Sequence, residues 1–476
     1  MNWSRLVQCM GGDEPFGIAH AESEIEHTNR PANHMRWETP LGNVLHLTVP
    51  PTVYPPREDT TLLASVLNRQ RLTPKTRWLE IGCGSGALSL FASGFGCDVT
   101  ACDVNPLAVA CTRNHLSDLG ISAKVFEGGP GPEEDGDLTQ WGGDLLYDVV
   151  VWNTPYLAAS SLGSGALGPM EEAAFTDTDS KGLHVRLFEM LARGHLLTES
   201  GVAYITVSSS GFAQEAHAAA WSRGLAARTI AQTQFEDGEV LSVLALWRPY
   251  RGCPMVNLKT TKSTNDEVLN LSTKAGATVR AEKQTSGRGR HGRDWVNLEG
   301  AMMASWLVID GRSLKHNTMD QLRVGEALIR LIKGWSLCDE DDVCLKWPND
   351  LYIRGNGEDF YKAGGILFEA TSQGRKHRLV LGIGININAT EKQPYAGLEN
   401  LGLDVDAQTL HAAVHAVVAS LFERLSGVPE STVESTEVEA AVSRGLNLLG
   451  KPLYRGLEFA FHGIDEHGAL LADVGE

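Results

Sequence analysis

Short apolar runs and stretches with helical spacing alternate from Arg77 to Asn153. In order they read RWLEI, a glycine turn, GALSLFASGF, DVTACDV, NPLAVACTRNHLSDLG and YDVVVWN. Strands separated by helices pair in parallel, because each helix returns the chain to the same edge of the sheet. Three further runs, VRLFEMLARGHLL, VAYITVS and VLSVLALW, add a helix and two strands before residue 248. We therefore expect an α/β domain with a seven-stranded sheet over residues 46–250.

The chain of 476 residues is long enough for about three domains. The segment RPYRGCPM at 248–255 has two prolines and a glycine, which favours a domain junction. Beyond it, mixed β-rich and helical runs predict an α+β domain over 256–430, and short strands predict a small β lobe over 445–476. Residues 1–45 are polar and lack a sustained period, so we expect an N-terminal extension there.

Composition narrows the class of protein. Apolar residues make up 42% and charged residues 21%, values typical of globular proteins. The 59 acidic residues outnumber the 41 basic ones, which disfavours nonspecific binding to nucleic acid. The eight cysteines form no CxxC pair, the start lacks the pattern of a signal peptide, and no apolar run reaches the roughly 18 residues of a membrane span. We expect a cytoplasmic protein with no membrane partner.

The segment LEIGCGSG begins the first candidate site. Glu80 ends a predicted strand, and Gly82, Gly84 and Gly86 follow in a turn where glycine permits positive φ and close approach of a ligand. Asp103 ends the next predicted strand, where a carboxylate can accept hydrogen bonds from ribose hydroxyls. The turn alone is also compatible with an ordinary strand–helix connection. Together with the acid it favours binding of a nucleoside-type cofactor.

The segment YDVVVWNTPYL places a tetrapeptide, Asn153–Thr154–Pro155–Tyr156, at the end of the fourth predicted strand. A planar amide or aromatic amino group is a poor nucleophile, so a site that modifies one must accept hydrogen bonds from its NH2 and align it. The Asn153 side-chain oxygen and the Thr154 carbonyl could accept them, and Tyr156 could form a flat wall. An Asn-Pro turn without catalytic function is the alternative.

The GxGxG spacing resembles the S-adenosylmethionine fingerprint of class I methyltransferases, with a Rossmann-like fold. Residues 53–248 resemble the HemK-like release factor glutamine methyltransferases, chiefly the eukaryotic and archaeal branch. The segments that carry this resemblance are VYPPREDTTLL, LEIGCGSG, CDVNPLAVACT and NTPYL. The resemblance implies S-adenosylmethionine bound by Glu80, the three glycines, Asp103 and Asn153, with Asn153 and Tyr156 catalytic. It implies the Gly-Gly-Gln glutamine of a class I peptide release factor as substrate, and a small zinc-binding activator subunit as partner.

Two departures from this family leave alternatives open. NTPY stands where the family has NPPY, and we expect the missing proline to loosen the turn. The loop AAFTDTDSKG also lacks the family's tryptophan and paired glycines. The alternatives are a binding module that has lost catalysis, or methylation of adenine amino groups in nucleic acid.

The segment KQTSGRGRHGRDW at 283–295 begins a second candidate site. Its interleaved arginines and glycines are suited to a flexible clamp for phosphate, although an RNA-contacting segment has the same composition. KSTND at 262–266, LKWPNDLY at 345–352, KAGGILFE at 362–369 and LGIGININ at 381–388 flank it. Together, and in this order, these motifs resemble the catalytic domain of biotin protein ligases, and the segment after 445 resembles the start of their SH3-like C-terminal domain.

This second resemblance implies a role for each motif residue. Biotin and biotinyl-AMP would be held by Ser263, Thr264, Asn265, Gln284, Gly287, Arg288, Gly289, Arg290, Arg293 and Lys362. ATP would be held by Trp295, Asn349 and Asn386, with Asp350 as a Mg²⁺ ligand. Lys362, Lys346 and Arg290 would be catalytic, because cationic groups stabilise the reacting carboxylate and α-phosphate.

The resemblance further implies ATP, Mg²⁺ and biotin as reactants and a biotin carboxyl carrier domain as partner. The helix-turn-helix domain of some biotin ligases has no counterpart in the sequence, so we expect no DNA-binding domain. The C-terminal lobe is short, which predicts an incomplete SH3-like fold. Taken together, the sequence predicts a bifunctional enzyme with methyltransferase and biotin ligase activities.

Overall fold

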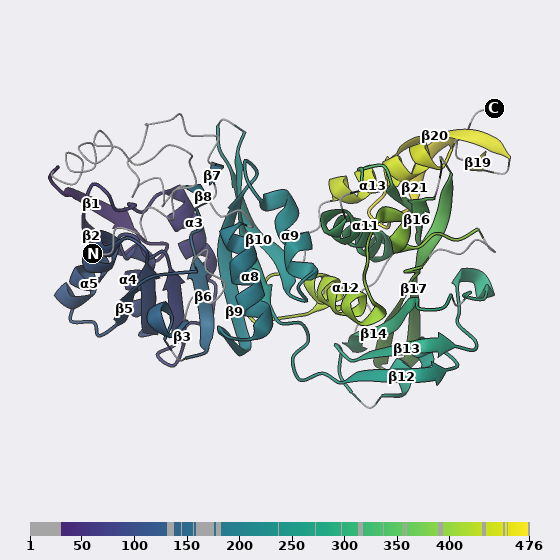
Figure 1. The fold of residues 1–476 in the computed structure, drawn as a ribbon, viewed down its shortest axis with the longest axis horizontal. Coiled ribbons are helices and arrows are strands. Elements are labelled where there is room, and N and C mark those ends of the chain that lie inside the picture. Colours follow the sequence, from purple (N-terminus) through teal and green to yellow (C-terminus); the bar gives the residue numbers. More distant parts are fainter. Residues whose placement is uncertain are drawn as a thin grey trace. The chain divides into compact units, whose positions relative to one another are not determined.

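The computed structural model describes residues 30–130, 138–143, 145–155, 157–158, 176–177, 182–236, 238–271, 273–296, 298–312, 318–336, 338–355, 357, 359–388, 394–430, 435–450, 453–454 and 456–474. The chain forms two compact units (Figure 1). Unit 1 comprises Met1–Ala220, Ala227–Arg248 and Arg424–Pro429, and unit 2 comprises Trp221–Ala226, Pro249–Glu423 and Glu430–Glu476.

Unit 1 begins with a β-hairpin, β1 (Asn33–Glu38) and β2 (Val44–Val49), paired antiparallel. Trp37 is buried, and its indole N–H donates to Thr61 Oγ1 at 3.1 Å. The expectation of a polar extension through residue 45 is therefore wrong for residues 33–45. Only alternate residues of the hairpin are buried, so the segment reads as polar when its residues are averaged.

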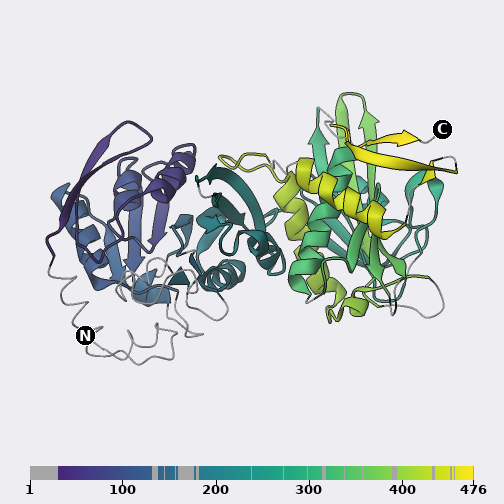
Figure 2. The same ribbon diagram turned by 90° about the horizontal axis from the view of Figure 1, so that it is seen from above.

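A seven-stranded sheet with flanking helices forms the core of unit 1 (Figures 1 and 2). Its strand order is β10-β11-β9-β6-β3-β4-β5. The strands are β3 (Arg77–Ile81), β4 (Asp98–Asp103), β5 (Lys124–Glu127), β6 (Tyr147–Trp152), β9 (Leu197–Ser208), β10 (Ala226–Gln234) and β11 (Val240–Trp247). The helices are α3 (Glu58–Leu67), α4 (Ala87–Ser93), α5 (Pro106–Asp118), α6 (Leu138–Trp141), α8 (Leu183–Arg193) and α9 (Ala213–Trp221). Two-residue strands β7 (Leu157–Ala158) and β8 (Thr176–Asp177) pair separately.

The direction of the strands matches the expected Rossmann-like class. β3 runs parallel to β4 and β6, β4 to β5, and β6 to β9, whereas β11 is antiparallel to β9. The chain builds the sheet outward from β3, first through β4 and β5 on one side and then through β6 and β9 on the other. The carboxyl ends of β3, β4 and β6 therefore meet at one edge of the sheet, where open α/β sheets bind ligands.

Unit 2 contains a second seven-stranded sheet, in the order β12-β13-β14-β18-β17-β16-β15. β12 and β13 are parallel and the other neighbouring pairs are antiparallel, which confirms the expected mixed sheet. The strands are β12 (Met255–Thr261), β13 (Thr278–Gln284), β14 (Met302–Gly311), β15 (Val343–Lys346), β16 (Asp350–Arg354), β17 (Phe360–Gln373) and β18 (Lys376–Ile385). The α-helices are α10 (Thr264–Asn270), α11 (Thr318–Trp335), α12 (Ala407–Phe422) and α13 (Ser435–Leu448), and two 3₁₀ turns are η2 (Arg290–Gly292) and η3 (Leu398–Leu401).

The C-terminal segment follows α13 and belongs to unit 2. It forms a small sheet of β19 (Leu453–Tyr454), β20 (Leu457–Ile464) and β21 (Leu470–Val474). The expected boundary at residue 445 lies inside α13, because that helix continues to Leu448. The turn between β20 and β21 contacts the turn between β15 and β16, since Trp347 Nε1 donates to the Gly468 carbonyl at 3.0 Å.

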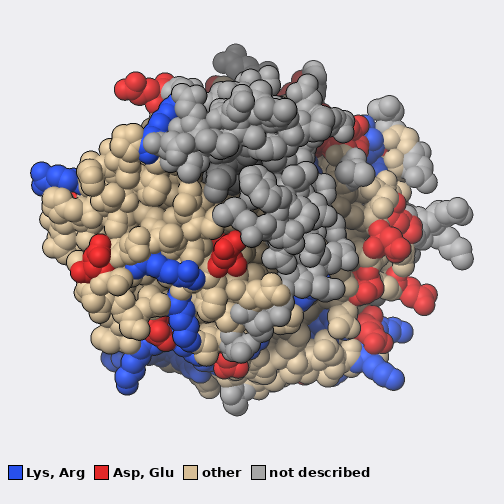
Figure 3. Space-filling view, turned by 60° about the vertical axis from the view of Figure 1, so that its left-hand side comes forward, with Lys and Arg blue, Asp and Glu red and all other residues tan. Residues whose placement is uncertain are grey.

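The described residues bear on three expectations, which concern surface charge, the cysteines and membrane-spanning helices. On the face drawn in Figure 3, acidic and basic side chains are interspersed among uncharged residues. The described cysteines are all free. Among the residues described, no helix combines the length and hydrophobicity required to cross a membrane.

Two histidines lie in the core of unit 2. His411 and His415, on α12, are nearly fully buried beside Trp306 of β14. The Trp306 indole N–H donates to His415 Nδ1 at 2.8 Å, which requires an unprotonated nitrogen. Burial lowers the pKa of His411 to about 3 and that of His415 to about 4. Both rings are therefore neutral in the folded protein near neutral pH.

These histidines predict a loss of stability in acid. Their pKa values are lower in the folded chain than the value near 6.5 of the unfolded chain, so the unfolded chain takes up protons first as the pH falls. The contribution of these histidines to the free energy of unfolding is therefore complete above pH 6.5 and is lost as the pH falls toward 3 to 4. Between pH 6.5 and 5 each histidine should lower the free energy of unfolding by about 2 kcal/mol. Urea titrations over this range should show a shallower decline for His411→Gln than for the wild-type chain. Equal declines would contradict the assignment.

Candidate functional site

The glycine turn after β3 leads directly into α4. Gly82, Gly84 and Gly86 have φ values of 64°, 51° and 79°, in the left-handed region that favours glycine. A Cβ on Gly84 would lie 3.1 Å from the Tyr54 carbonyl oxygen, and one on Gly86 would lie 2.8 Å from Thr112 Oγ1. The turn thus needs glycine both for its backbone conformation and for space.

Asp103 ties this turn to the end of β4. Its Oδ2 accepts from the Gly84 N–H at 2.8 Å, and its Oδ1 accepts from the Asn105 N–H at 2.8 Å. Burial raises the pKa of the carboxyl group. Each carboxylate oxygen can accept more than one hydrogen bond, so these contacts are compatible with ribose hydroxyls. Val104 follows and is 54% exposed, an apolar surface beside the acid that sequence analysis did not single out.

Glu80 occupies a different environment from the one expected of a ligand-binding acid. It is buried, and one of its oxygens accepts from the Ser89 hydroxyl of α4. Burial raises its pKa to about 8. The structure therefore places part of this carboxyl against α4, immediately below the glycine turn, where it contacts the helix that the turn begins.

Residues outside the glycine motif also support the turn. The Thr48 N–H donates to His115 Nε2 at 2.9 Å, so the other ring nitrogen of a neutral histidine carries the hydrogen. That nitrogen lies 2.9 Å from the Ser85 carbonyl and donates to it. Asn105 Nδ2 donates to the Thr52 carbonyl at 2.7 Å, which holds the 53–67 segment near the turn. Only the folded arrangement indicates the role of His115.

Asn153 and Thr154 follow β6, at the same edge of the sheet, and both contact Thr206 of β9. The Thr154 N–H donates to Thr206 Oγ1 at 3.0 Å, and Thr154 Oγ1 donates to the Thr206 carbonyl at 2.5 Å. Thr206 Oγ1 in turn donates to Asn153 Oδ1 at 2.8 Å. The expectation of a loosened turn is wrong, because Thr154 makes two hydrogen bonds, and proline has no N–H for the first. Pro155 is described, whereas Tyr156 and the loop at 173–182, apart from β8 and Gly182, lie outside the described residues.

The Thr206 contacts predict a specific loss of stability. Thr206→Val keeps the shape of the side chain but leaves the buried Thr154 N–H without its acceptor, which should cost about 1–3 kcal/mol. Chemical denaturation of the full chain, followed by the transition of unit 1, measures this difference. Thr206→Ser retains the hydroxyl and is the matched control. A Val variant as stable as the Ser variant would contradict the inferred network.

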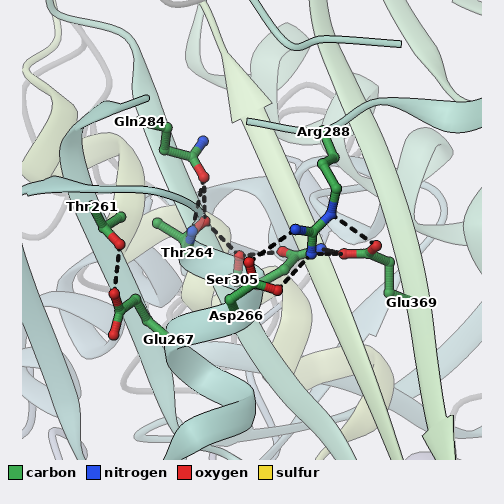
Figure 4. Close-up of polar contacts among 9 residues, drawn as sticks. Thr261, Thr264, Asp266, Glu267, Gln284, Arg288, Ser305 and Glu369 are labelled. Carbon is green, nitrogen blue, oxygen red and sulfur yellow. Dashed lines mark hydrogen bonds and ion pairs between the residues drawn. The ribbon is translucent and has the colours of Figure 1, made fainter. Parts of the chain in front are cut away.

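In unit 2, the start of α10 packs against β13 and β14 through polar side chains (Figure 4). Ser263, Thr264, Asn265 and Gln284 are all buried. The Thr264 N–H and hydroxyl both donate to Gln284 Oε1, at 2.8 and 3.1 Å. Ser305 Oγ lies 2.7 Å from Thr264 Oγ1 and 2.5 Å from Asn265 Oδ1. The structure thus brings together four of the residues expected to hold biotin, and it adds Ser305.

The glycine–arginine segment folds back on itself. The Trp295 N–H donates to the Gly287 carbonyl at 2.9 Å, and the Gly289 N–H donates to the Arg293 carbonyl at 2.6 Å. Arg290 is half-buried and begins η2, whereas Arg293 is exposed after it. The segment is therefore a closed loop with two arginines near its tip.

Arg288, at the base of this loop, is paired with two carboxylates (Figure 4). Its guanidinium donates to Asp266 at 2.8 and 2.9 Å and to Glu369 at 2.9 and 3.1 Å. The hydrogen bonds raise the pKa of Arg288 and lower that of Asp266. Both acids lie in motifs that the sequence analysis identified, KSTND and KAGGILFE, but neither was assigned a role there.

Trp295 joins the loop to the sheet. Gly365 of β17 pairs with Gly384 of β18, and the indole ring lies over both. A Cβ on Gly365 would lie 3.0 Å from the ring, and one on Gly384 would overlap it. The Trp295 indole nitrogen is buried and has no hydrogen-bond partner among the described residues.

Lys362 of β17 lies beside Trp295. Its ammonium group is 2.8 Å from Asp350 Oδ1 and 5.7 Å from the centre of the indole ring. Asp350, the expected Mg²⁺ ligand, therefore pairs with a lysine. Within the described ranges, no group of three or more His, Cys, Asp or Glu side chains could hold a metal ion.

The other expected nucleotide-binding residues differ in their surroundings. Lys346 is exposed and its ammonium donates to the Tyr352 hydroxyl at 3.1 Å, whereas Asn349 Nδ2 donates to the Ile366 carbonyl at 3.1 Å. Asn386 is 3% exposed, and its Nδ2 donates to the Ala396 carbonyl at 3.2 Å. Its Oδ1 has no donor in the described part of the chain. A buried acceptor without a donor costs free energy, so this site fits a ligand that brings one, such as an amino group or a hydroxyl.

Comparisons with known proteins match the two units to different families. Residues 255–386 match the biotin/lipoate A/B protein ligase family, and residues 57–177 match the methyltransferase small domain. The chain is 29% identical to "Bifunctional ligase/repressor BirA" of Escherichia coli (strain K12), over 44% of this chain and 66% of the relative. It is also 29% identical to "Biotin--[acetyl-CoA-carboxylase] ligase" of Paracoccus denitrificans, over 45% of this chain and 92% of the relative.

A solved structure titled "Biotin protein ligase from Aquifex aeolicus in complex with biotin and ATP" aligns with 46% of this chain and 94% of its own, with 24% identity and a TM-score of 0.34. The match to the first relative spans just under two thirds of that protein's length. The two family models thus match separate parts of the chain. The ligase model matches residues of unit 2, and the methyltransferase model matches residues of unit 1.

Proposed function

We propose that unit 2 is a biotin protein ligase, which joins biotin to a lysine of a carrier protein at the expense of ATP. One observation carries this proposal. Within the segment that matches the ligase family, residues 255–386, the Trp295 side chain lies beside the Lys362 ammonium group on one side and beside Gly287, a neighbour of Gln284, on the other. We assign the catalytic domain to 256–430, and we assign the partial SH3-like lobe to the strands β19, β20 and β21 that follow α13.

The reaction has two steps. In the first, the biotin carboxylate attacks the α-phosphate of ATP, which forms biotinyl-AMP and releases pyrophosphate. Lys362 would hold the carboxylate, and Arg290 and Arg293 would neutralise the phosphate charge. In the second, the carrier lysine attacks the acyl carbon, a proton leaves the amine, and AMP departs with the electron pair of the broken bond.

The side chains around the site support a separate position for biotin, for the nucleotide and for its phosphates. The start of α10 and Gln284 would hold the ureido ring, Trp295 and Asn386 would contact the nucleotide, and Asn349 and Lys346 would lie on its phosphate side. Asp350, which pairs with Lys362, would be the residue that holds Mg²⁺, and the ion would offset negative charge on the phosphates. The partner would be a biotin carboxyl carrier domain, and the free thiols fit a cytoplasmic location.

Lys362→Ala should reduce carrier biotinylation by about 100-fold or more, because a preorganised cation at the reacting carboxylate is lost. Transfer of radiolabelled biotin to a purified carrier domain, with ATP and Mg²⁺, measures the rate. Lys376→Ala, which removes an exposed lysine from the far end of β18, is the control and should retain the wild-type rate. Undiminished labelling by Lys362→Ala would contradict this role, and no labelling by the wild-type chain would contradict the ligase proposal.

We further propose that unit 1, which contains most of the expected domain at 46–250, is an S-adenosylmethionine-dependent methyltransferase. Three residues at the carboxyl edge of its sheet support this proposal. Asp103 faces the glycine turn, and Thr206 orients Asn153, whose Oδ1 keeps a second lone pair for a substrate NH2. The resemblance of residues 53–248 to release factor glutamine methyltransferases favours the Gly-Gly-Gln glutamine of a class I peptide release factor as substrate, and it implies a small zinc-binding activator subunit as partner.

Mass spectrometry of a purified release factor, after incubation with this protein and S-adenosylmethionine, tests the second activity. We expect a gain of one methyl group on the Gly-Gly-Gln glutamine, at least with the zinc activator present. Asn153→Ala should abolish this gain, because the acceptor of the amide hydrogens is removed.

Two other results would identify the alternatives. Calorimetric binding of S-adenosylmethionine without methylation of the release factor would favour a binding module. Methylation of adenine in an oligonucleotide, with none in the release factor, would replace the proposed substrate.

A further inference from the structure

Glu369 accepts hydrogen bonds from two parts of the ligase site (Figure 4). Its Oε2 accepts from Asn265 Nδ2 at 2.5 Å and from Arg288 Nη2 at 2.9 Å, and its Oε1 accepts from Arg288 Nε at 3.1 Å. Asn265 lies on α10, whereas Arg288 lies at the base of the glycine loop. One carboxylate on β17 therefore connects a ureido-binding side chain to the loop.

The guanidinium of Arg288 is almost fully used by carboxylates. It has five N–H groups, and two pairs of them form forks with Glu369 and Asp266. One N–H is left to face a phosphate. Arg288 is thus suited to hold the loop in place, and the phosphate-facing role falls to Arg290 and Arg293.

The same carboxylate orients the amide of Asn265. A carboxylate accepts hydrogen bonds and donates none, so the Asn265 NH2 must point toward Glu369 and its Oδ1 must point away. Oδ1 then lies 2.5 Å from Ser305 Oγ and above Gly382, where an added Cβ would be 2.5 Å from it. An amide fixed in this way presents an acceptor to a ureido N–H.

We propose that Glu369 is a positioning residue that links biotin recognition by Asn265 to the placement of the glycine loop by Arg288, with Asp266 acting on the loop alone. This inference rests on the proposed ligase function of unit 2. The three charged side chains are 30–48% exposed, so a simple surface ion pair with no effect on the site is the competing explanation.

Two substitutions separate the two roles. In Glu369→Gln the single amide oxygen cannot accept from both nitrogens of Arg288 and from Asn265, so the KM for biotin should rise about tenfold or more. Asp266→Asn leaves the contact between Asn265 and Glu369 intact, so its KM for biotin should stay within about threefold of wild type. The KM for ATP should change by less than about threefold in both. Glu282→Gln neutralises an exposed acid on β13 and is the matched control.

Trypsin cleavage without any ligand tests the loop separately. Both Glu369→Gln and Asp266→Asn should be cleaved after Arg288 faster than the wild-type chain and Glu282→Gln, because each loses one of the two forks. Circular dichroism melts of each variant identify any that do not fold, and Glu369→Asp, which keeps the charge, should restore slow cleavage in part.

Equal values of the KM for biotin in Glu369→Gln and Asp266→Asn would overturn the linking role, and unchanged cleavage would overturn the anchoring role. The ligase proposal fails in a different way. If the wild-type chain neither releases pyrophosphate with biotin and ATP nor labels a carrier domain, that proposal is wrong. The cleavage result then still decides whether Asp266 and Glu369 hold the loop.

Discussion

The proposed ligase site depends on the close approach of one indole ring, that of Trp295, to two strands. Trp295 can lie over β17 and β18 only because Gly365 and Gly384 are paired across them and neither has a Cβ. This contact holds the returning end of the glycine loop on the sheet, while Arg288 holds its base to Glu369 and Asp266. The arginines between these two points are carried on a short turn whose ends are fixed. A loop held at both ends can move at its tip without losing its place over the sheet.

In unit 1, hydrogen bonds rather than the packing of a ring hold the turns of the candidate site. Its candidate pocket lies where the carboxyl ends of β3, β4 and β6 meet, and hydrogen bonds from side chains hold the connecting turns. Asp103 holds the glycine turn, and Thr206 holds the Asn153 turn. The methyltransferases that this segment resembles have a proline where this chain has Thr154. A proline would restrict φ, whereas Thr154 forms hydrogen bonds to Thr206 of the neighbouring strand β9. The two solutions restrict the same turn by different physical means.

Local motifs predicted which residues of the two candidate sites lie together. The three glycines and Asp103 were identifiable because they lie within one strand–helix–strand segment, from β3 to the end of β4. Lys362 and the arginines of the loop were named because their motifs, in this order, resemble those of biotin protein ligases. The errors arose where contacts join distant segments: Thr206 lies 52 residues from Thr154, and Glu369 lies 104 residues from Asn265. The hairpin at 33–49 was missed because only alternate side chains of its strands are buried.

The sequence by itself determined the two fold classes, the order of elements and the chemical type of each motif, because strand and helix periods and glycine turns are local properties of a chain. Only the tertiary structure decided which side chains meet. It paired Arg288 with two acids, turned Glu80 toward α4, and set Lys362 beside Asp350. Such pairings depend on strand register and on the packing of helices against a sheet. A shift of one residue in a strand would send each of its side chains to the opposite face.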